Sequence, residues 1–253
     1  MTDLLDAVQL GCDVADLVRI RRGHAALVEE SARNWFDSHR DLLRALPFVD
    51  GDHVVAVGDS ITADSLGWFE QLGRALSMDG SAVRMTNLAV SGHSSEGAVE
   101  MLDVIAAARP SHVLVMLGTN DVRRHGPQLD TRLCSLPETE RNLRSIHRVL
   151  SGQVGAAVTL ITPTAIDQTA LTEDRYPHVA WCQEDLREVA RRILELDLPA
   201  IGAFDPTVLG RGSRLRLCDG IHPTLDGHRD LLTLIAESLA SISTRPHTGR
   251  PVA

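Results

Sequence analysis

Short apolar runs alternate with longer amphipathic stretches along most of the chain. Five runs rich in Val, Leu and Ile have the length of strands, and they cover residues 53–57, 82–90, 112–117, 156–162 and 199–205. The segments between and after them have helical spacing, at 66–78, 95–108, 136–151, 178–196 and 225–241. Strands that alternate with helices predict an α/β fold, in which a mostly parallel sheet is covered by helices on both faces.

Two apolar stripes at helical spacing precede the first strand and predict helices within residues 2–46. The first stripe consists of Leu4, Val8, Gly11, Ala15 and Val18, and the second of Ala32, Trp35, Phe36, His39, Leu42, Leu43 and Leu46. Pro47 is expected to end the second helix. That stripe carries too much apolar area to stay exposed, so we expect the helices to pack on the domain. A lid over the site and a homodimer surface are the alternatives.

These patterns divide the chain into three parts. Residues 1–50 form a helical extension, residues 51–243 the α/β domain, and residues 244–253 a flexible tail. The length of 253 residues allows one large domain or two small ones, and it is sufficient for a substantial core.

Composition narrows the classes of function. The net charge is −9 without a concentrated basic region, which disfavours a nucleic-acid partner, and all 25 basic residues are arginine, which excludes a catalytic lysine. The first residues carry acids where a signal peptide would be basic, and no run reaches the ~18 apolar residues of a membrane span. With four scattered cysteines, a cytoplasmic location is expected, although export by another route stays open.

Chemically useful residues follow the predicted strands at their carboxyl ends. The first run leads into a Gly-Asp-Ser turn that ends at Ser60, the second into a loop with Gly92, and the third into GTND with Asn120. The last loop, CDGIHPT, carries Asp219 and His222. Because the carboxyl ends of parallel strands meet at one edge, these loops are expected to converge there. Together they offer a hydroxyl, a base with its carboxylate, and hydrogen-bond donors, which is a full set for acyl transfer.

The same motifs, in this order, resemble the SGNH hydrolases, the GDSL-type lipase/esterase superfamily. The matching blocks are GDSIT, the glycine of NLAVSGHSS, GTND and DGIHPTLDGH, and the resemblance covers roughly residues 52–241. It implies a flavodoxin-like three-layer α/β/α sandwich and serine-dependent cleavage or transfer of acyl groups, with no cofactor and no metal. The helical segment of about 50 residues before the first block is a departure from the family pattern.

The resemblance also implies a role for each matching residue. Ser60 is the nucleophile, His222 the base that takes its proton, and Asp219 the carboxylate that orients the imidazole. The backbone N–H groups of Ser60 and Gly92 and the side-chain amide of Asn120 form the oxyanion hole, where each donor is worth about 3 kcal/mol. Glycine at position 92 is explained by a Cβ that would crowd this site.

Four further residues are candidates for contact with substrate: Asp59, His93, Arg123 and Tyr176. Each has a simpler interpretation, namely a structural turn residue, a surface histidine, a solvated cation beside Arg124, and a core aromatic. Trp181 is weighed in the same way, as a pocket or a core residue. The histidines other than His222 show no ligand spacing, so we expect no metal site.

The sequence therefore predicts a serine esterase that acts on a small or medium acyl ester. An acyltransferase with the same triad and an alcohol acceptor is the nearest alternative. A non-catalytic binding module on the same scaffold is a third hypothesis, and the fold alone does not decide among them.

Overall fold

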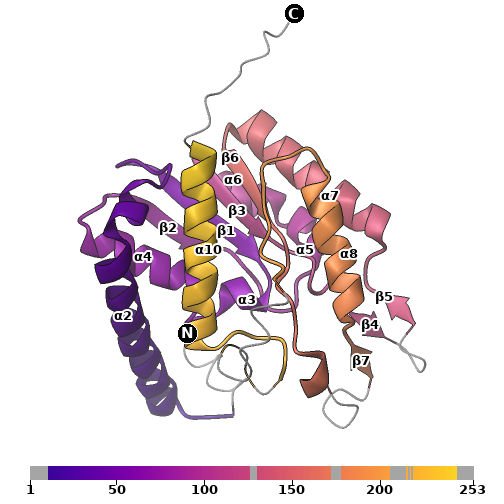
Figure 1. Ribbon diagram of the computed structural model, residues 1–253, viewed down its shortest axis with the longest axis horizontal. Coiled ribbons are helices and arrows are strands. Elements are labelled where there is room, and N and C mark those ends of the chain that lie inside the picture. The colour runs from indigo at the N-terminus through magenta and orange to yellow at the C-terminus, as the bar shows by residue number, and fades with distance from the viewer. Residues whose placement is uncertain are drawn as a thin grey trace, which may run out of the picture.

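The computed structural model describes residues 11–125, 130–171, 178–205, 215, 217 and 219–243, and its centre is a five-stranded parallel sheet. The strands are β1 (His53–Gly58), β2 (Arg84–Asn87), β3 (His112–Met116), β6 (Ala157–Ile161) and β8 (Ala200–Ile201). Their order is β2-β1-β3-β6-β8, and every neighbouring pair is parallel (Figure 1). This is the flavodoxin-like order, so the predicted fold class is confirmed.

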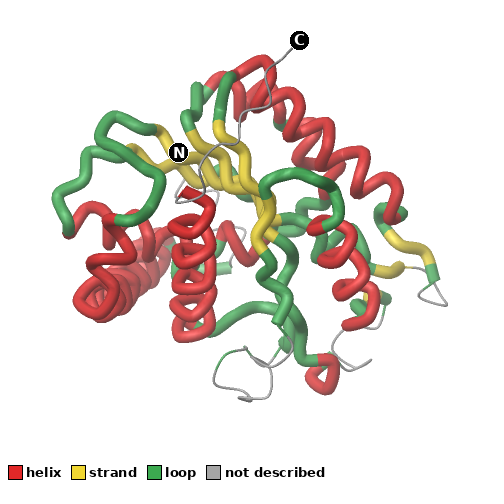
Figure 2. Tube along the Cα trace, turned by 45° about the horizontal axis from the view of Figure 1, so that its top comes forward, coloured by secondary structure: helices red, strands yellow, loops and turns green. Residues whose placement is uncertain are grey.

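Helices cover both faces of the sheet, as the alternating pattern predicted (Figure 2). One face carries α2 (Val14–Arg44), α4 (Trp68–Met78) and α10 (Leu225–Ser243). The other carries α5 (Ser95–Glu100), α6 (Leu102–Ala107), α7 (Leu136–Val149) and α8 (Gln183–Leu194). Three shorter helices lie in connections: α3 (Ser60–Ala63), η1 (Leu150–Val154) and η2 (Gln168–Ala170).

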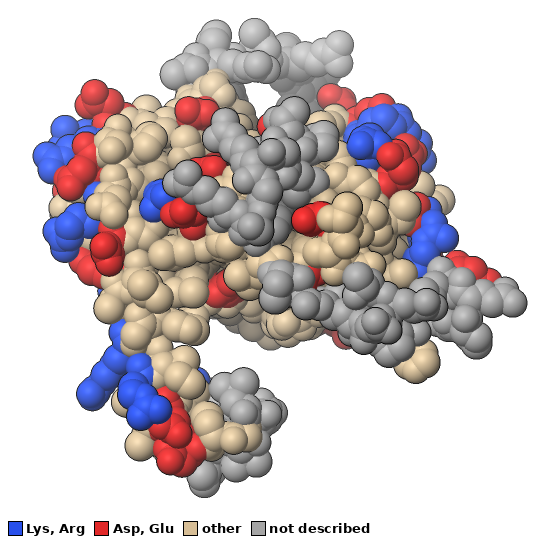
Figure 3. All heavy atoms as spheres, turned by 60° about the horizontal axis from the view of Figure 1, so that its bottom comes forward, with Lys and Arg blue, Asp and Glu red and all other residues tan. Residues whose placement is uncertain are grey.

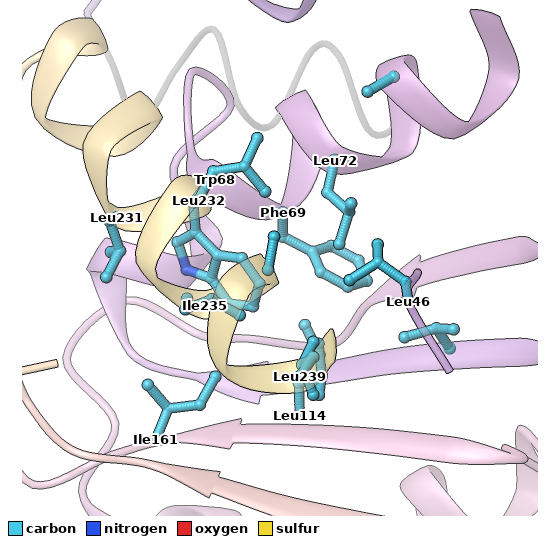
Figure 4. Packing of buried hydrophobic residues seen from close by; sticks show 14 of the residues in the cluster. Leu46, Trp68, Phe69, Leu72, Leu114, Ile161, Leu231, Leu232, Ile235 and Leu239 are labelled. Atoms are coloured by element: carbon cyan, nitrogen blue, oxygen red, sulfur yellow. The ribbon is translucent and has the colours of Figure 1, made fainter. Parts of the chain in front are cut away.

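The side chains of successive strand residues pack alternately into two separate hydrophobic cores. In β1, Val54 and Ala56 face the α2, α4 and α10 side, whereas Val55 and Val57 face the opposite side. The first core contains large side chains of α4 and α10 packed on the strands (Figure 4). Because side chains alternate along a strand, a strand between two helical layers must be apolar at every position, which explains the continuous runs in the sequence.

Within the described residues, the N-terminal segment is a long helix with one kink. α2 runs from Val14 to Arg44, with a non-helical backbone only at His39 (φ −132°, ψ 27°). The His39 Nδ1–H donates to the carbonyl oxygen of Trp35 at 2.9 Å. At the kink, this side chain therefore competes with a backbone N–H for a carbonyl acceptor of the helix. Residues 1–10 and 244–253, which hold part of the first stripe and the predicted tail, lie outside the described residues.

The second half of α2 is part of the domain core. Trp35 is 1% exposed and its Nε1–H donates to the hydroxyl of Thr233 in α10 at 2.9 Å. Ser31 donates to Gln71 of α4 at 2.9 Å. The chain itself covers the Trp35 stripe, so a dimer would have to use another face of the helix. A homodimer through the N-terminal helices stays a prediction.

A small antiparallel sheet was not predicted. It consists of β4 (Arg124–His125), β5 (Thr131–Arg132) and β7 (Val179–Ala180), in the order β5-β4-β7. Arg124 donates twice to one carboxylate oxygen of Asp185, at 2.6 and 2.8 Å, and Arg132 binds the other oxygen. Arg124 is therefore an ion-pair residue that holds this sheet to α8.

Candidate active site

A tight turn places Ser60 at the carboxyl end of β1, as the first residue of α3. Asp59 caps this helix by accepting the backbone N–H of Ile61 at 3.0 Å. At Gly58, a Cβ would come within 2.7 Å of the Thr62 hydroxyl and 2.9 Å of the Met116 carbonyl oxygen. The turn is thus closed so tightly that only glycine fits before Asp59. As the first helical residue, Ser60 has a backbone N–H without an intrahelical acceptor, and this donor is available at the site.

The loop before α10 presents His222 to this serine. Asp219 accepts the backbone N–H groups of Ile221 at 2.8 Å and His222 at 2.9 Å, so the carboxylate folds the loop around itself. Gly220 lies inside this turn with a φ of +76°, and a Cβ there would meet the Asp167 carbonyl oxygen at 2.6 Å. The short spacing between the acid and the base therefore depends on a glycine between them.

Ser60, His222 and Asp219 form a continuous hydrogen-bonded series. The distance from Ser60 Oγ to His222 Nε2 is 2.8 Å, and that from His222 Nδ1 to Asp219 Oδ2 is 2.7 Å. Because the carboxylate can only accept, Nδ1 carries the hydrogen and Nε2 is left as the acceptor for the serine hydroxyl. This is the tautomer that a general base requires.

The electrostatics of Asp219 favour its charged form. Burial opposes ionisation, but the backbone N–H groups of His222 and Ile221 and the imidazole of His222 outweigh it, and the pKa of Asp219 is lowered from its ordinary value. The carboxylate therefore stays ionised across the neutral range and can stabilise an imidazolium that forms beside it.

Gly92 lies beside the nucleophile because its loop continues the pairing of β2 with β1. The Val90 N–H donates to the Gly58 carbonyl at 3.0 Å, and a turn from Val90 to His93 closes at 3.1 Å. Gly92 is the third residue of that turn, with a φ of +83°. A Cβ at Gly92 would meet no protein atom within 4 Å, so the backbone conformation favours glycine here. Crowding of a bound substrate by a Cβ stays a prediction.

Asn120 joins the Gly92 loop to the GTND loop. Its Nδ2 donates to the carbonyl oxygen of His93 at 3.1 Å, and the side chain is 4% exposed. An amide nitrogen has two N–H donors, so one remains for an oxyanion. The three donors implied by the resemblance, at Ser60, Gly92 and Asn120, thus belong to loops that contact one another.

A second carboxylate, that of Asp121, links the GTND loop to α5 and α7 by hydrogen bonds. It is fully buried, accepting the Ser95 backbone N–H at 3.0 Å and the Thr139 hydroxyl at 2.9 Å. Trp181 adds a hydrogen bond from its Nε1–H to the Thr119 carbonyl at 3.1 Å, and its ring belongs to the second core. Trp181 is therefore a core residue, and neither contact was evident from the sequence.

Asp59 is buried beneath the nucleophile rather than exposed to substrate. Its side chain is 1% exposed, and burial raises its pKa to about 6, against the opposing effects of the Ile61 N–H and the Thr119 hydroxyl. The earlier expectation of substrate contact at Asp59 is corrected by this position, because the carboxylate is occupied as a helix cap.

The other candidates for substrate contact are placed differently. The His93 ring packs over Gly97 of α5, where a Cβ would come within 3.1 Å of it. Arg123 donates from Nε to His125 Nε2 at 3.1 Å. Tyr176 lies outside the described residues. Substrate contact by His93, Arg123 and Tyr176 stays a prediction.

Within the described ranges, no three His, Cys, Asp or Glu side chains gather closely enough to hold a metal ion. In the same part of the chain, no helix combines the length and apolar character that crossing a bilayer requires.

The fold and this site define a serine hydrolase built on an open parallel sheet. Residues 56–229, more than half of the chain, match the sequence model of the GDSL-like lipase/acylhydrolase family, and the chain belongs to that family. α2 precedes the matched segment.

Known relatives agree with this assignment. Esterase TesA of Pseudomonas aeruginosa strain PAO1 is 34% identical over 96 residues, which are 35% of this chain and 48% of that esterase, so the alignment spans about half of that relative. A crystal structure of TesA has a TM-score of 0.55 at 25% identity and covers 74% of this chain and 97% of that one. The psychrotrophic esterase EstA from Pseudoalteromonas sp. has the same fold, with a TM-score of 0.55 at 18% identity over 77% of this chain and 100% of that one.

Substitution of Gly220 by alanine tests how much the acid–base loop depends on its backbone. We expect a loss of about 1–3 kcal/mol in unfolding free energy and a lowered kcat, because the Cβ would push the loop away from Asp167. Gly51→Ala is the matched control, since Gly51 has a φ of +94° but no atom within 4 Å of a Cβ. Thermal unfolding and ester hydrolysis measure both. Equal behaviour of the two variants would contradict a special constraint at Gly220.

Proposed function

We propose that this protein is a serine esterase that cleaves small or medium acyl esters through an acyl-enzyme on Ser60. The observation that carries this proposal is the hydrogen-bonded series from Ser60 through His222 to Asp219. A serine hydroxyl is a weak nucleophile until a base removes its proton, and His222 Nε2 is placed as that base.

In the first half-reaction, Ser60 Oγ attacks the ester carbonyl carbon while its proton passes to His222 Nε2. The carbonyl oxygen becomes an oxyanion, held by the backbone N–H groups of Ser60 and Gly92 and the amide of Asn120. When this intermediate collapses, the bond to the alcohol breaks, and the alcohol leaves with the proton from His222. Asp219 stabilises the imidazolium that exists between these two proton transfers.

In the second half-reaction, water takes the place of the alcohol. His222 accepts a proton from the water as its oxygen attacks the acyl carbon, and the collapse returns that proton to Ser60 Oγ. The products are a carboxylic acid and the free enzyme. Two relatives support ester substrates by their names, since TesA and EstA are both esterases and EstA was crystallised inhibited by monoethylphosphonate.

The identity of the nucleophile is tested with a fluorophosphonate probe. We expect one covalent adduct, mapped by mass spectrometry to Ser60, because the probe needs a serine activated by a base. Ser91→Ala, which removes another loop hydroxyl near Gly92, should label like the wild type, and Ser60→Ala should not label at all. Labelling that persists in Ser60→Ala would reject the assignment.

The reaction itself is followed with 4-nitrophenyl esters from acetate to octanoate, with and without alcohol acceptors. Release of the free carboxylic acid in the presence of acceptors is expected for an esterase. Formation of a new ester with the added alcohol as the main product would show that transfer, not hydrolysis, is the activity.

A further inference from the structure

A groove of about 420 Å³ lies between α2 and the segment that carries the nucleophile. We call it the α2 groove. Its walls include Arg21 and His24 of α2, Ala63 of α3, Arg74 of α4, and Ala89 after β2. Its volume falls within the ~300–1,000 Å³ typical of sites for small ligands. Nothing in the proposed mechanism uses it.

Two walls of the α2 groove come from the segments that carry Ser60 and Gly92. Ala63 follows Ser60 by three residues in α3, which is a rise of about 5 Å along the helix axis. Ala89 precedes Gly92 by three residues in the loop that supplies an oxyanion donor. Asn87 ties these two walls together, because its Nδ2 donates to the carbonyl oxygen of Thr62 at 2.7 Å. Two walls of the groove are therefore continuous along the chain with the segments that carry Ser60 and Gly92.

The opposite wall is a fixed part of the fold. His24 Nδ1 and the Ser65 hydroxyl are hydrogen-bonded at 2.8 Å, which anchors the middle of α2 beside the loop that follows α3. Val28, one turn further along α2, is 2% exposed and also lines the groove. Because α2 precedes the family match, this wall is an addition to the matched domain. Figure 3 shows a projection from the body of the molecule at this edge, with basic and acidic side chains on its surface.

The charged side chains that line the α2 groove are two arginines, Arg21 and Arg74, and one carboxylate, Glu70, so cations are in excess there. Arg74 is exposed, and within the described part of the chain its guanidinium group forms no hydrogen bond or ion pair. Glu70, one turn earlier in α4, would be its natural partner, but the Nδ2 of Asn87 donates to Glu70 instead, at 3.4 Å. An arginine left without a carboxylate offers a planar pair of donors that suits a carboxylate or a phosphate.

We propose that the α2 groove is a substrate subsite that binds an anionic group of the ester, a carboxylate or a phosphate, with Arg74 as its specificity-determining contact. This inference rests on the proposed esterase function, because it assigns one end of the substrate to the groove and the scissile bond to Ser60. The helix that precedes the family domain thereby acts as a wall of the substrate site.

Matched pairs of esters test the proposal. In one pair, the acyl group carries the charge: mono(4-nitrophenyl) adipate against 4-nitrophenyl hexanoate. In a second set, the leaving group carries it: 4-acetoxybenzoate and 4-acetoxyphenyl phosphate against methyl 4-acetoxybenzoate. We expect Arg74→Gln to raise KM about tenfold for the anionic esters of at least one set, equivalent to about 1.4 kcal/mol, and to leave their neutral counterparts unchanged. The effect should shrink as salt is added, since the cation is exposed.

Two further variants separate the subsite from general effects. Arg148→Gln removes an equally exposed arginine from the last turn of α7, on the other face of the sheet, and should leave the preference for anionic esters unchanged. Ala25→Leu narrows the α2 groove from its α2 wall at an exposed helical position that tolerates leucine. It should raise KM for the anionic esters that Arg74→Gln affects and spare 4-nitrophenyl acetate.

The outcomes distinguish this proposal from the proposed function. If neutral esters are hydrolysed and Ser60 is labelled, but Arg74→Gln does not change the ratio of anionic to neutral kcat/KM, the anionic subsite is rejected. An equal rise of KM for charged and neutral members would show a groove that binds without regard to charge, which also overturns the proposal. If the wild type cleaves no ester and Ser60 is not labelled, the esterase function fails, and the subsite with it.

Discussion

Replacement of His222 by alanine is expected to lower kcat by about six orders of magnitude while KM stays within a fewfold of wild type. His222 Nε2, at 2.8 Å from Ser60 Oγ, is the only acceptor that the site offers among the described residues for the serine proton. Without it, the hydroxyl must attack while still protonated, and the leaving alcohol receives no proton. Binding of the ester does not need either transfer, so the loss falls on kcat.

The double variant Ser60→Ala/His222→Ala should be hardly slower than either single variant. Groups that act as one unit lose their whole contribution when one of them is removed, so their effects do not add. Steady-state hydrolysis of 4-nitrophenyl acetate, with thermal unfolding as a check on the fold, measures each variant. His147→Ala is the control, since His147 lies in α7 on the other face of the sheet. A His222→Ala enzyme within tenfold of wild-type kcat would refute the assigned base.

The main elements could be predicted from the sequence because each strand lies between two helical layers. β3 shows this most clearly, since Val113 and Val115 enter one core while Leu114 and Met116 enter the other. From Val113 to Met116 this strand has no polar position, and its run of apolar residues is unmistakable. The amphipathic helices have only one apolar face, and their spacing identified α4, α7 and α10 to within a few residues.

Other features of the fold leave no such signal. β4, β5 and β7 have two residues each, too few for a pattern, and they depend on the ion pairs of Asp185 with Arg124 and Arg132. The kink of α2 at His39 was not predicted, because His39 belongs to the same apolar stripe as Trp35 and Leu42 in the sequence. At this kink, the His39 side chain donates a hydrogen bond to the carbonyl oxygen of Trp35.

The candidate site shows the same division between local and long-range information. Gly58, Gly92 and Gly220 could be recognised as turn glycines from their motifs, since the loops are short and sequential. The collisions that glycine avoids at Gly58 and Gly220 could not be predicted, because they involve distant residues such as Met116 and Asp167. The burial of Asp59 and the α2 groove likewise depend on how separate segments pack.

Replacement of Asp219 by asparagine is expected to lower kcat by up to about four orders of magnitude with little change in KM. The Asn Oδ1 can still accept the backbone N–H groups of Ile221 and His222, which keeps the loop folded. Its Nδ2, however, is a donor and cannot accept from His222 Nδ1–H. The imidazole would therefore adopt the other tautomer, with its hydrogen on Nε2, pointing at Ser60 instead of accepting its proton.

A purely structural role for Asp219 makes a different prediction. The carboxylate folds the loop ahead of α10, which begins at Leu225, so a structural role would place the cost in stability, typically ~1 kcal/mol, and shift Tm by about 2–4 °C. The pKa of Asp219 is lowered on folding from 3.8, so its charge contributes stability above that pH, and this contribution is lost as the pH falls through the folded value. Asp219→Asn should remove only this acid-side dependence while kcat collapses at neutral pH. Near-normal kcat together with a lowered Tm would instead leave Ser60 and His222 as a dyad.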